Sequence, residues 1–213
     1  MERKIYSFEN KRIEKFNYLL HIPKNASGEG LPLIVALHGA GERGDDFSKI
    51  PVHGLAKYIE AGLDIPAVVI APQCPEGFIW NLLTIELKEL IDFIISEYGI
   101  DRDRVSITGL SMGGYGTWEM GMSYPGFFAA LAPICGGGVS WRAELIGKTP
   151  VWAFHGDCDT VVPPVNSIEM CERLKASGGD VKLTIFHGVE HGSWEPAYEE
   201  TKVIEFLLSA KRG

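Results

Sequence analysis

The sequence lacks a basic excess, a long apolar run and a recognisable targeting segment. Its 20 Lys and Arg are outnumbered by 28 Asp and Glu, giving a net charge of −8, which argues against nucleic acid as a partner. No apolar stretch approaches about 18 residues, so we expect no membrane-spanning segment. The charged start MERKIYSFENKR is unlike a signal peptide. The expected location is therefore cytoplasmic, or secreted if a leader or a larger parent chain is missing.

The sequence also lacks the spacings of common metal and nucleotide sites. Its 4 cysteines lie far apart, with no CxxC pair and no Cys/His pair at zinc spacing. We expect free thiols, no metal and no cofactor. The spacing of the cysteines alone does not decide whether one disulfide forms. The glycine-rich stretch HGAGERG contains neither GxGxxG nor GxxxxGK[ST], so it does not match a nucleotide-binding loop.

The pattern that is present is an alternation of short apolar strands and amphipathic helices. With 213 residues and 46% hydrophobic side chains, the chain fits one domain over residues 1–213. Continuously apolar strands alternating with helices predict an α/β fold with a mostly parallel sheet covered on both faces, and the first two strands predict an antiparallel edge. The predicted strands are residues 5–8, 16–22, 33–37, 67–71, 105–108, 128–134, 151–154 and 181–186. The predicted helices are residues 84–98, a stretch from the glycine-rich turn at 109–113 to Tyr124, residues 164–177 and residues 195–210.

A GxSxG motif follows one of these strands. Gly109, Ser111 and Gly113 lie between the strand at 105–108 and a helix-compatible stretch, as a nucleophile elbow requires. The glycines leave room for a tight turn that projects the serine hydroxyl. The turn also places the amide of Met112 at a helix N-terminus, where it can donate a hydrogen bond to an oxyanion. An ordinary glycine-rich turn is the alternative.

A nucleophilic serine needs a base and a carboxylate that orients this base. Two aspartates, Asp157 and Asp159, follow the strand at 151–154, and two histidines, His187 and His191, follow the strand at 181–186. In open α/β sheets, chemistry collects in loops beyond the carboxyl ends of the strands. Both members of each pair are therefore candidates for the same role.

Five segments together resemble the α/β-hydrolase superfamily, and more narrowly the phospholipase/carboxylesterase and dienelactone-hydrolase-like esterases, including a "predicted peptidase" branch. They are LHGAGERG, TGLSMGGYGTW, PICGGG, FHGDCDTVVP and VEHGSW. The resemblance implies an α/β-hydrolase fold and a catalytic triad of Ser111, His191 and Asp159. It also implies an oxyanion hole formed by the backbone amides of Ala40 and Met112. His38, His155 and His187 then have structural roles, and His21 and His53 have no route to the nucleophile.

The remaining expectations concern the substrate. Trp80, Trp194 and Glu42 are candidates for the pocket wall, whereas Trp118 fits the core. Only about a dozen residues separate PICGGG from the next strand, so we expect no large lid and a soluble, short-chain acyl ester as the small-molecule substrate. A serine peptidase or a thioesterase on the same triad is the alternative. A non-catalytic binding protein is disfavoured, because such proteins usually lack one triad residue.

Overall fold

A mostly parallel sheet forms the centre of the molecule. The computed structural model describes residues 5–8, 16–24 and 30–213. Within them, eight strands pair in the order β1-β2-β4-β3-β5-β6-β7-β8. Strands β3 to β8 are mutually parallel, whereas β2 is antiparallel to both β1 and β4, so the predicted antiparallel edge is confirmed. The strands are β1 (Ile5–Phe8), β2 (Phe16–His21), β3 (Leu31–Leu37), β4 (Val68–Gln73), β5 (Ile100–Leu110), β6 (Ala130–Ile134), β7 (Val151–Gly156) and β8 (Val181–Phe186).

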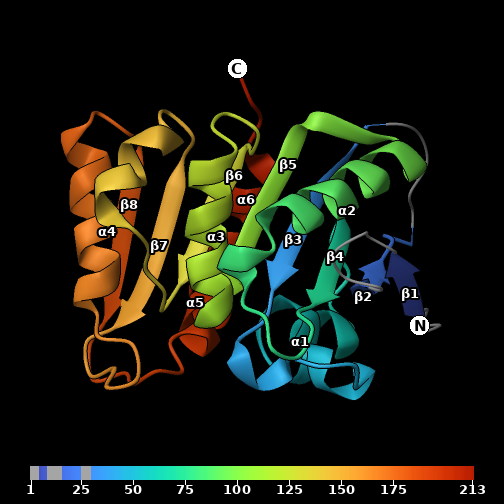
Figure 1. Ribbon diagram of the computed structural model, residues 1–213, viewed down its shortest axis with the longest axis horizontal. Coiled ribbons are helices and arrows are strands. Elements are labelled where there is room, and N and C mark those ends of the chain that lie inside the picture. The colour runs from blue at the N-terminus through green and yellow to red at the C-terminus, as the bar shows by residue number, and fades with distance from the viewer. Residues whose placement is uncertain (1–4, 9–15, 25–29) are drawn as a thin grey trace.

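Helices cover both faces of this sheet (Figure 1). Leu33, Val35 and Leu37 of β3 belong to one core with α2, α3 and α4, whereas Ile34 and Ala36 belong to the other core with α1, α5 and α6. This alternation is the two-residue period of a strand buried on both sides. The helices are α1 (Gly54–Glu60), α2 (Thr84–Glu97), α3 (Met112–Ser123), α4 (Val165–Ala176), α5 (Trp194–Glu200) and α6 (Val203–Ser209), with short 3₁₀ turns η1 (Ala40–Glu42), η2 (Phe47–Val52), η3 (Trp80–Leu82) and η4 (Ser140–Ile146). In the part of the chain that the structure describes, no helix combines the length and hydrophobicity of a membrane span.

Strand β4 runs through Pro72, where the sequence predicted its end. The parallel pairing of β4 with β3 extends only to Ile70, so at Pro72 the only paired neighbour is β2. Proline is tolerated at such a half-paired position, because its missing N–H is not required on that side.

The predicted closing helix at 195–210 is two helices. Thr201 is extended (φ −116°, ψ 172°) and separates α5 from α6. Its hydroxyl donates to the carbonyl of Ala197 at 2.5 Å and accepts from the amide of Val203 at 3.2 Å. One side chain therefore ends the first helix and caps the second.

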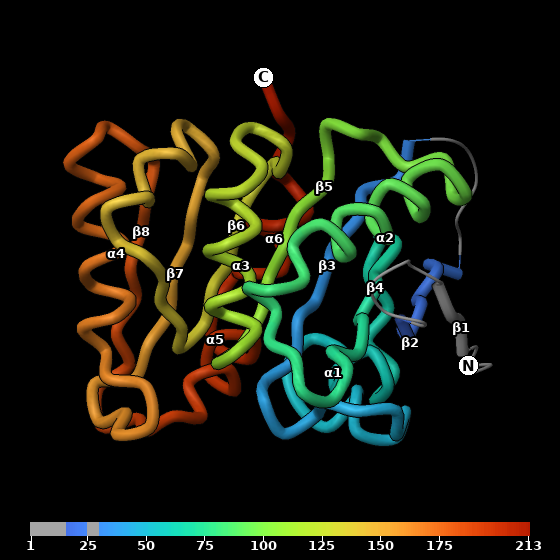
Figure 2. Tube along the Cα trace, viewed as in Figure 1, coloured from blue at the N-terminus to red at the C-terminus, as the bar shows by residue number. Residues whose placement is uncertain are grey.

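The carboxyl ends of the parallel strands meet at one edge of the molecule. The arrowheads of β3, β4 and β7 point toward the lower edge in Figure 1, and the loops that follow them gather there in Figure 2. The segments that carry the candidate site residues leave the sheet at this edge.

Candidate active site

Ser111 occupies a strained turn between β5 and α3. Its backbone has φ 51° and ψ −117°, a left-handed conformation that is unfavourable for a residue with a Cβ atom. A Cβ atom on Gly109 would lie 2.9 Å from Cβ of Leu37, and one on Gly113 would lie 2.7 Å from the carbonyl oxygen of His38. The predicted need for small residues on both sides of the serine is confirmed.

The structure brings Ser111, His191 and Asp159 into one hydrogen-bonded line. The Ser111 hydroxyl lies 2.9 Å from His191 Nε2, and His191 Nδ1 lies 2.7 Å from Asp159 Oδ2. Because the carboxylate only accepts, Nδ1 carries the proton and Nε2 accepts from the serine. This is the tautomer in which the imidazole can take the serine proton.

The Asp159 carboxylate is fully buried and accepts several hydrogen bonds. Its Oδ1 accepts from the amides of Val161 and Val162 at 2.9 and 2.8 Å. Burial favours the neutral acid, yet the hydrogen bonds from His191 and these amides outweigh it and lower the pKa of Asp159. The carboxylate is thus kept ionised next to the imidazole.

Asp157 and His187, the alternative candidates, form a separate pair outside this line. His187 Nδ1 lies 2.8 Å from Asp157 Oδ2, and the Gly188 amide donates to Asp157 Oδ1 at 2.7 Å. The His187 side chain is 89% exposed. Asp157 therefore holds local backbone, and His187 directly follows the end of β8.

The loop after β3 lies beside the nucleophile. A Cβ atom on Gly39 would lie 3.7 Å from Cβ of Ser111. Ala40 is the first residue of η1 and is exposed, and Met112 is the first residue of α3. The amides of the first helical turn have no partner within their own helix, so both positions can present an N–H to an oxyanion.

Buried polar side chains hold this loop in place. His38 Nε2 accepts from the Cys74 amide, and Trp80 Nε1 donates to the His38 carbonyl, both at 2.9 Å. The Gln73 side chain donates to the carbonyls of Glu42 and Asp46 at 2.9 and 2.8 Å. Burial lowers the pKa of His38 to about 4, so its ring is neutral and accepts the amide hydrogen.

Of the two tryptophans expected in the wall of the substrate pocket, one is buried and one contacts the site. Trp80 is fully buried beneath the loop and does not line the pocket, which corrects the expectation; its indole is needed to hold the His38 carbonyl. Trp194 does contact the site, with its ring edge-on to His191 at 5.5 Å between centroids. Trp118 is buried in the core as predicted.

Glu42 and His53 lie next to each other near the site. Glu42 is only 5% exposed, and its two carboxylate oxygens each lie 3.8 Å from a histidine nitrogen, one of His38 and one of His53. The His53 ring lies 5.3 Å from that of Trp194. The expectation was that His53 has no route to the nucleophile; the structure places its ring against Trp194, whose ring contacts His191. The elements α1 and η2, which flank His53, were not predicted from the sequence.

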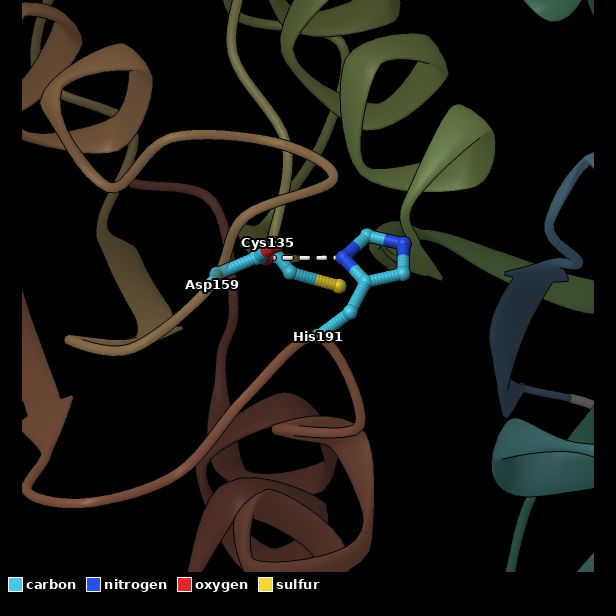
Figure 3. Close-up of side chains that lie close together, drawn as sticks. All are labelled: Cys135, Asp159 and His191. Carbon is cyan, nitrogen blue, oxygen red and sulfur yellow. Dashed lines mark hydrogen bonds and ion pairs between the residues drawn. The ribbon is translucent and has the colours of Figure 1, made fainter.

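Cys135 lies behind the Asp159–His191 pair, with its sulfur directed toward the imidazole (Figure 3). One ligand-type atom from each of these three side chains lies within 4.8 Å of the others. Zinc binds atoms of these types, but it binds a cysteine as the thiolate and not as the thiol. Burial raises the pKa of the Cys135 thiol to about 12, and its sulfur accepts from the Ser111 amide at 3.3 Å. At neutral pH the three side chains are a hydrogen-bonded imidazole–carboxylate pair beside a neutral thiol.

Known proteins are similar to this chain in sequence and in fold. The chain is 25% identical to poly(3-hydroxyalkanoate) depolymerase C of Paucimonas lemoignei over 80% of its length, and 25% identical to acetylxylan esterase A of Aspergillus awamori over 79%. A crystal structure of a thermostable esterase superimposes on 99% of the chain with a TM-score of 0.86 and 35% identity. The chain spans 48%, 59% and 63% of these three proteins, respectively.

The profile of one protein family matches most of the chain. The matched region, residues 80–208, contains Ser111, Asp159 and His191 and runs from η3 to α6. The thermostable esterase shares the same α/β-hydrolase fold. The chain belongs to the phospholipase/carboxylesterase family.

Proposed function

We propose that this protein is a serine carboxylesterase that hydrolyses soluble, short-chain acyl esters through an acyl-enzyme. The observation that carries the proposal is the line from Ser111 Oγ through His191 to Asp159, with distances of 2.9 and 2.7 Å. Membership of an esterase family and ester-cleaving relatives support the reaction class.

The first half-reaction forms the acyl-enzyme. His191 Nε2 takes the proton of Ser111 as its Oγ attacks the ester carbonyl carbon. The negative charge that develops on the carbonyl oxygen is stabilised by the amides of Ala40 and Met112. His191 then gives its proton to the departing alcohol, and Asp159 stabilises the imidazolium throughout.

The second half-reaction repeats these roles with water. His191 deprotonates a water molecule that attacks the acyl carbon, and the collapse of the second intermediate returns the proton to Ser111 and releases the acid. The site must therefore stay open to water on the side of His191, whose side chain is 20% exposed.

The proposed preference for short acyl groups comes from the crossover between β6 and β7. Among the described residues, this crossover forms only the seven-residue turn η4, where lipase-like hydrolases commonly carry a helical lid. The relative named as an acetylxylan esterase supports an ester with a small acyl group.

The test is a panel of acyl lengths and leaving groups, run with the wild type and Ser111→Ala. We expect p-nitrophenyl butyrate to be cleaved with a higher kcat/KM than the palmitate ester, and Ser111→Ala to be inactive. A long-chain preference would contradict the substrate proposal, and equal turnover by Ser111→Ala would contradict the mechanism. An aminoacyl anilide and an acyl-CoA in the same panel distinguish a peptidase or a thioesterase from an esterase.

A further inference from the structure

A second imidazole lies behind the acid of the proposed triad. His155 is on β7, four residues before Asp159, and its side chain is fully buried. The described mechanism gives it no role. The strand β7 is an interior strand that pairs with β6 and β8.

The Nε2 atom of His155 faces only acceptors. It lies 2.8 Å from the carbonyl oxygen of Val162 and 3.2 Å from Oδ2 of Asp159. Neither oxygen can donate, so Nε2 must carry a hydrogen and share it between them. The carboxylate oxygen that receives His191 Nδ1–H is thus also approached by a second imidazole N–H.

The other ring nitrogen is held by a hydroxyl. Ser167 Oγ, at the start of α4, lies 2.7 Å from His155 Nδ1 and 2.8 Å from the carbonyl oxygen of Gly136. Ser167 Oγ contacts both the ring and the Gly136 carbonyl, so α4 holds the orientation of the His155 ring. Burial lowers the pKa of His155.

We propose that His155 is a positioning residue that aims Asp159 Oδ2 at His191 and keeps this carboxylate ionised. The proposal rests on the assignment of the Ser111–His191–Asp159 triad made above. The Asp159 side chain has no exposed surface, so protein donors replace the water that would otherwise solvate its charge. Loss of the His155 N–H leaves one fewer donor on the oxygen that orients the base, and a misplaced orienting group lowers the rate without weakening substrate binding.

A purely structural role of His155 would be to hold the Val162 carbonyl. The two roles are distinguished by the pH profile. Among the described residues, the titratable groups that face Asp159 are His155 from β7, His191 before α5, Cys135 after β6 and Tyr115 of α3. A carboxylate with one donor fewer protonates at higher pH. This effect moves the acidic limb of the activity profile upward.

The experiment measures the rate of Ser111 phosphonylation by a fluorophosphonate, across pH 5 to 9, in the intact protein. This reaction needs the activated serine and no knowledge of the natural ester. The key variant is His155→Asn, whose amide reaches the position of Nδ1 but not that of Nε2. The matched variant is His155→Gln, whose longer side chain returns an N–H to the position of Nε2. Steady-state kcat and KM for p-nitrophenyl butyrate are measured alongside.

We expect His155→Asn to label about 10- to 100-fold more slowly at pH 7, to lose kcat with little change in KM, and to shift its acidic limb upward. His155→Gln should recover most of the rate and the wild-type limb. Equal rates and limbs in the wild type and His155→Asn, or equal losses in both variants, would overturn the proposal. A wild type in which Ser111 is not labelled would instead overturn the proposed function.

Ser167→Ala keeps the test decisive if neither variant at position 155 folds. This change removes only the hydroxyl that fixes Nδ1 and leaves the ring, so far-UV circular dichroism should show a folded protein. We expect a smaller loss in labelling rate with the same upward shift of the acidic limb. An unchanged limb in folded Ser167→Ala would contradict the positioning role.

Discussion

Asp157 and Asp159 are two residues apart and each meets a different histidine. Only Asp159 receives the imidazole that contacts Ser111, and the separate pair of Asp157 and His187 lies on the surface. We expect Asp159→Asn to lower kcat by about 1,000- to 10,000-fold, because an amide at this position favours the wrong tautomer of His191. The measurement is the hydrolysis of p-nitrophenyl butyrate.

Asp157→Asn is the matched control. An exposed carboxylate–imidazole pair contributes little, so this variant should stay within about threefold of the wild-type kcat. If the two variants exchanged these behaviours, the acid of the triad would be Asp157 and the observed hydrogen-bonded line would not be the catalytic one.

The glycines of the serine turn have a role that can be measured apart from catalysis. A Cβ atom on Gly113 would meet backbone atoms of Leu37 and His38, which cannot move without displacing β3, whereas one on Gly192 would meet nothing within 4 Å. We expect Gly113→Ala to lower the free energy of unfolding by about 2–3 kcal/mol and Gly192→Ala by less than about 0.5 kcal/mol. Urea denaturation followed by fluorescence measures both, and similar losses in the two variants would contradict the steric argument.

At the scale of elements, the break between α5 and α6 depends on one hydroxyl. Thr201 Oγ1 bonds to Ala197 and Val203, so Thr201→Val, which keeps the shape and loses the hydroxyl, should lower the free energy of unfolding by about 1 kcal/mol. Ser209→Ala is the control, because its hydroxyl makes one long, exposed bond of 3.3 Å to Phe206. A thermal unfolding series shows the difference, and equal melting temperatures for Thr201→Val and the wild type would count against the capping role.

The same break shows what the sequence can and cannot predict about elements. The helix at 84–98 was predicted to within one residue, because its apolar spacing is regular and Gly99, with φ 58°, follows its end. The α5–α6 break, η2 and α1 were missed, since local hydrogen bonds such as those of Thr201 and of Asp46 with Ser48 determine them. Hydrophobic periodicity carries no information about such bonds.

At the scale of the whole molecule, the sheet brings three distant segments to one edge. The strand pattern predicts that loops after β5, β7 and β8 meet, and this much follows from parallel topology. Which aspartate and which histidine meet Ser111 depends on loop geometry, so the residue pattern alone left both pairs open. The buried position of Trp80 and the nearness of His53 to Trp194 likewise depend on how loops fold over the sheet edge.

Stability toward acid is a property of the whole molecule that the loop after β3 influences through His38. Burial lowers the pKa of His38 from 6.5 to about 4. Between these pH values the unfolded chain binds a proton at His38 that the folded chain does not, so the free energy of unfolding decreases as the pH falls from 6.5 to 4. A difference of this size corresponds to a loss of about 3 kcal/mol across the window.

His38→Gln removes this titration while keeping an acceptor for the Cys74 amide. We expect the variant to be less stable than the wild type at pH 7, because the contact of Nδ1 with the Gly39 carbonyl is lost, but to lose less stability on acidification. The two unfolding curves should therefore converge between pH 6.5 and pH 4. Urea titrations at half-unit pH steps measure this directly. Parallel pH dependences would show that His38 has the same pKa in the folded and unfolded chains, in which case its Nε2 could not accept the Cys74 amide below pH 6.5.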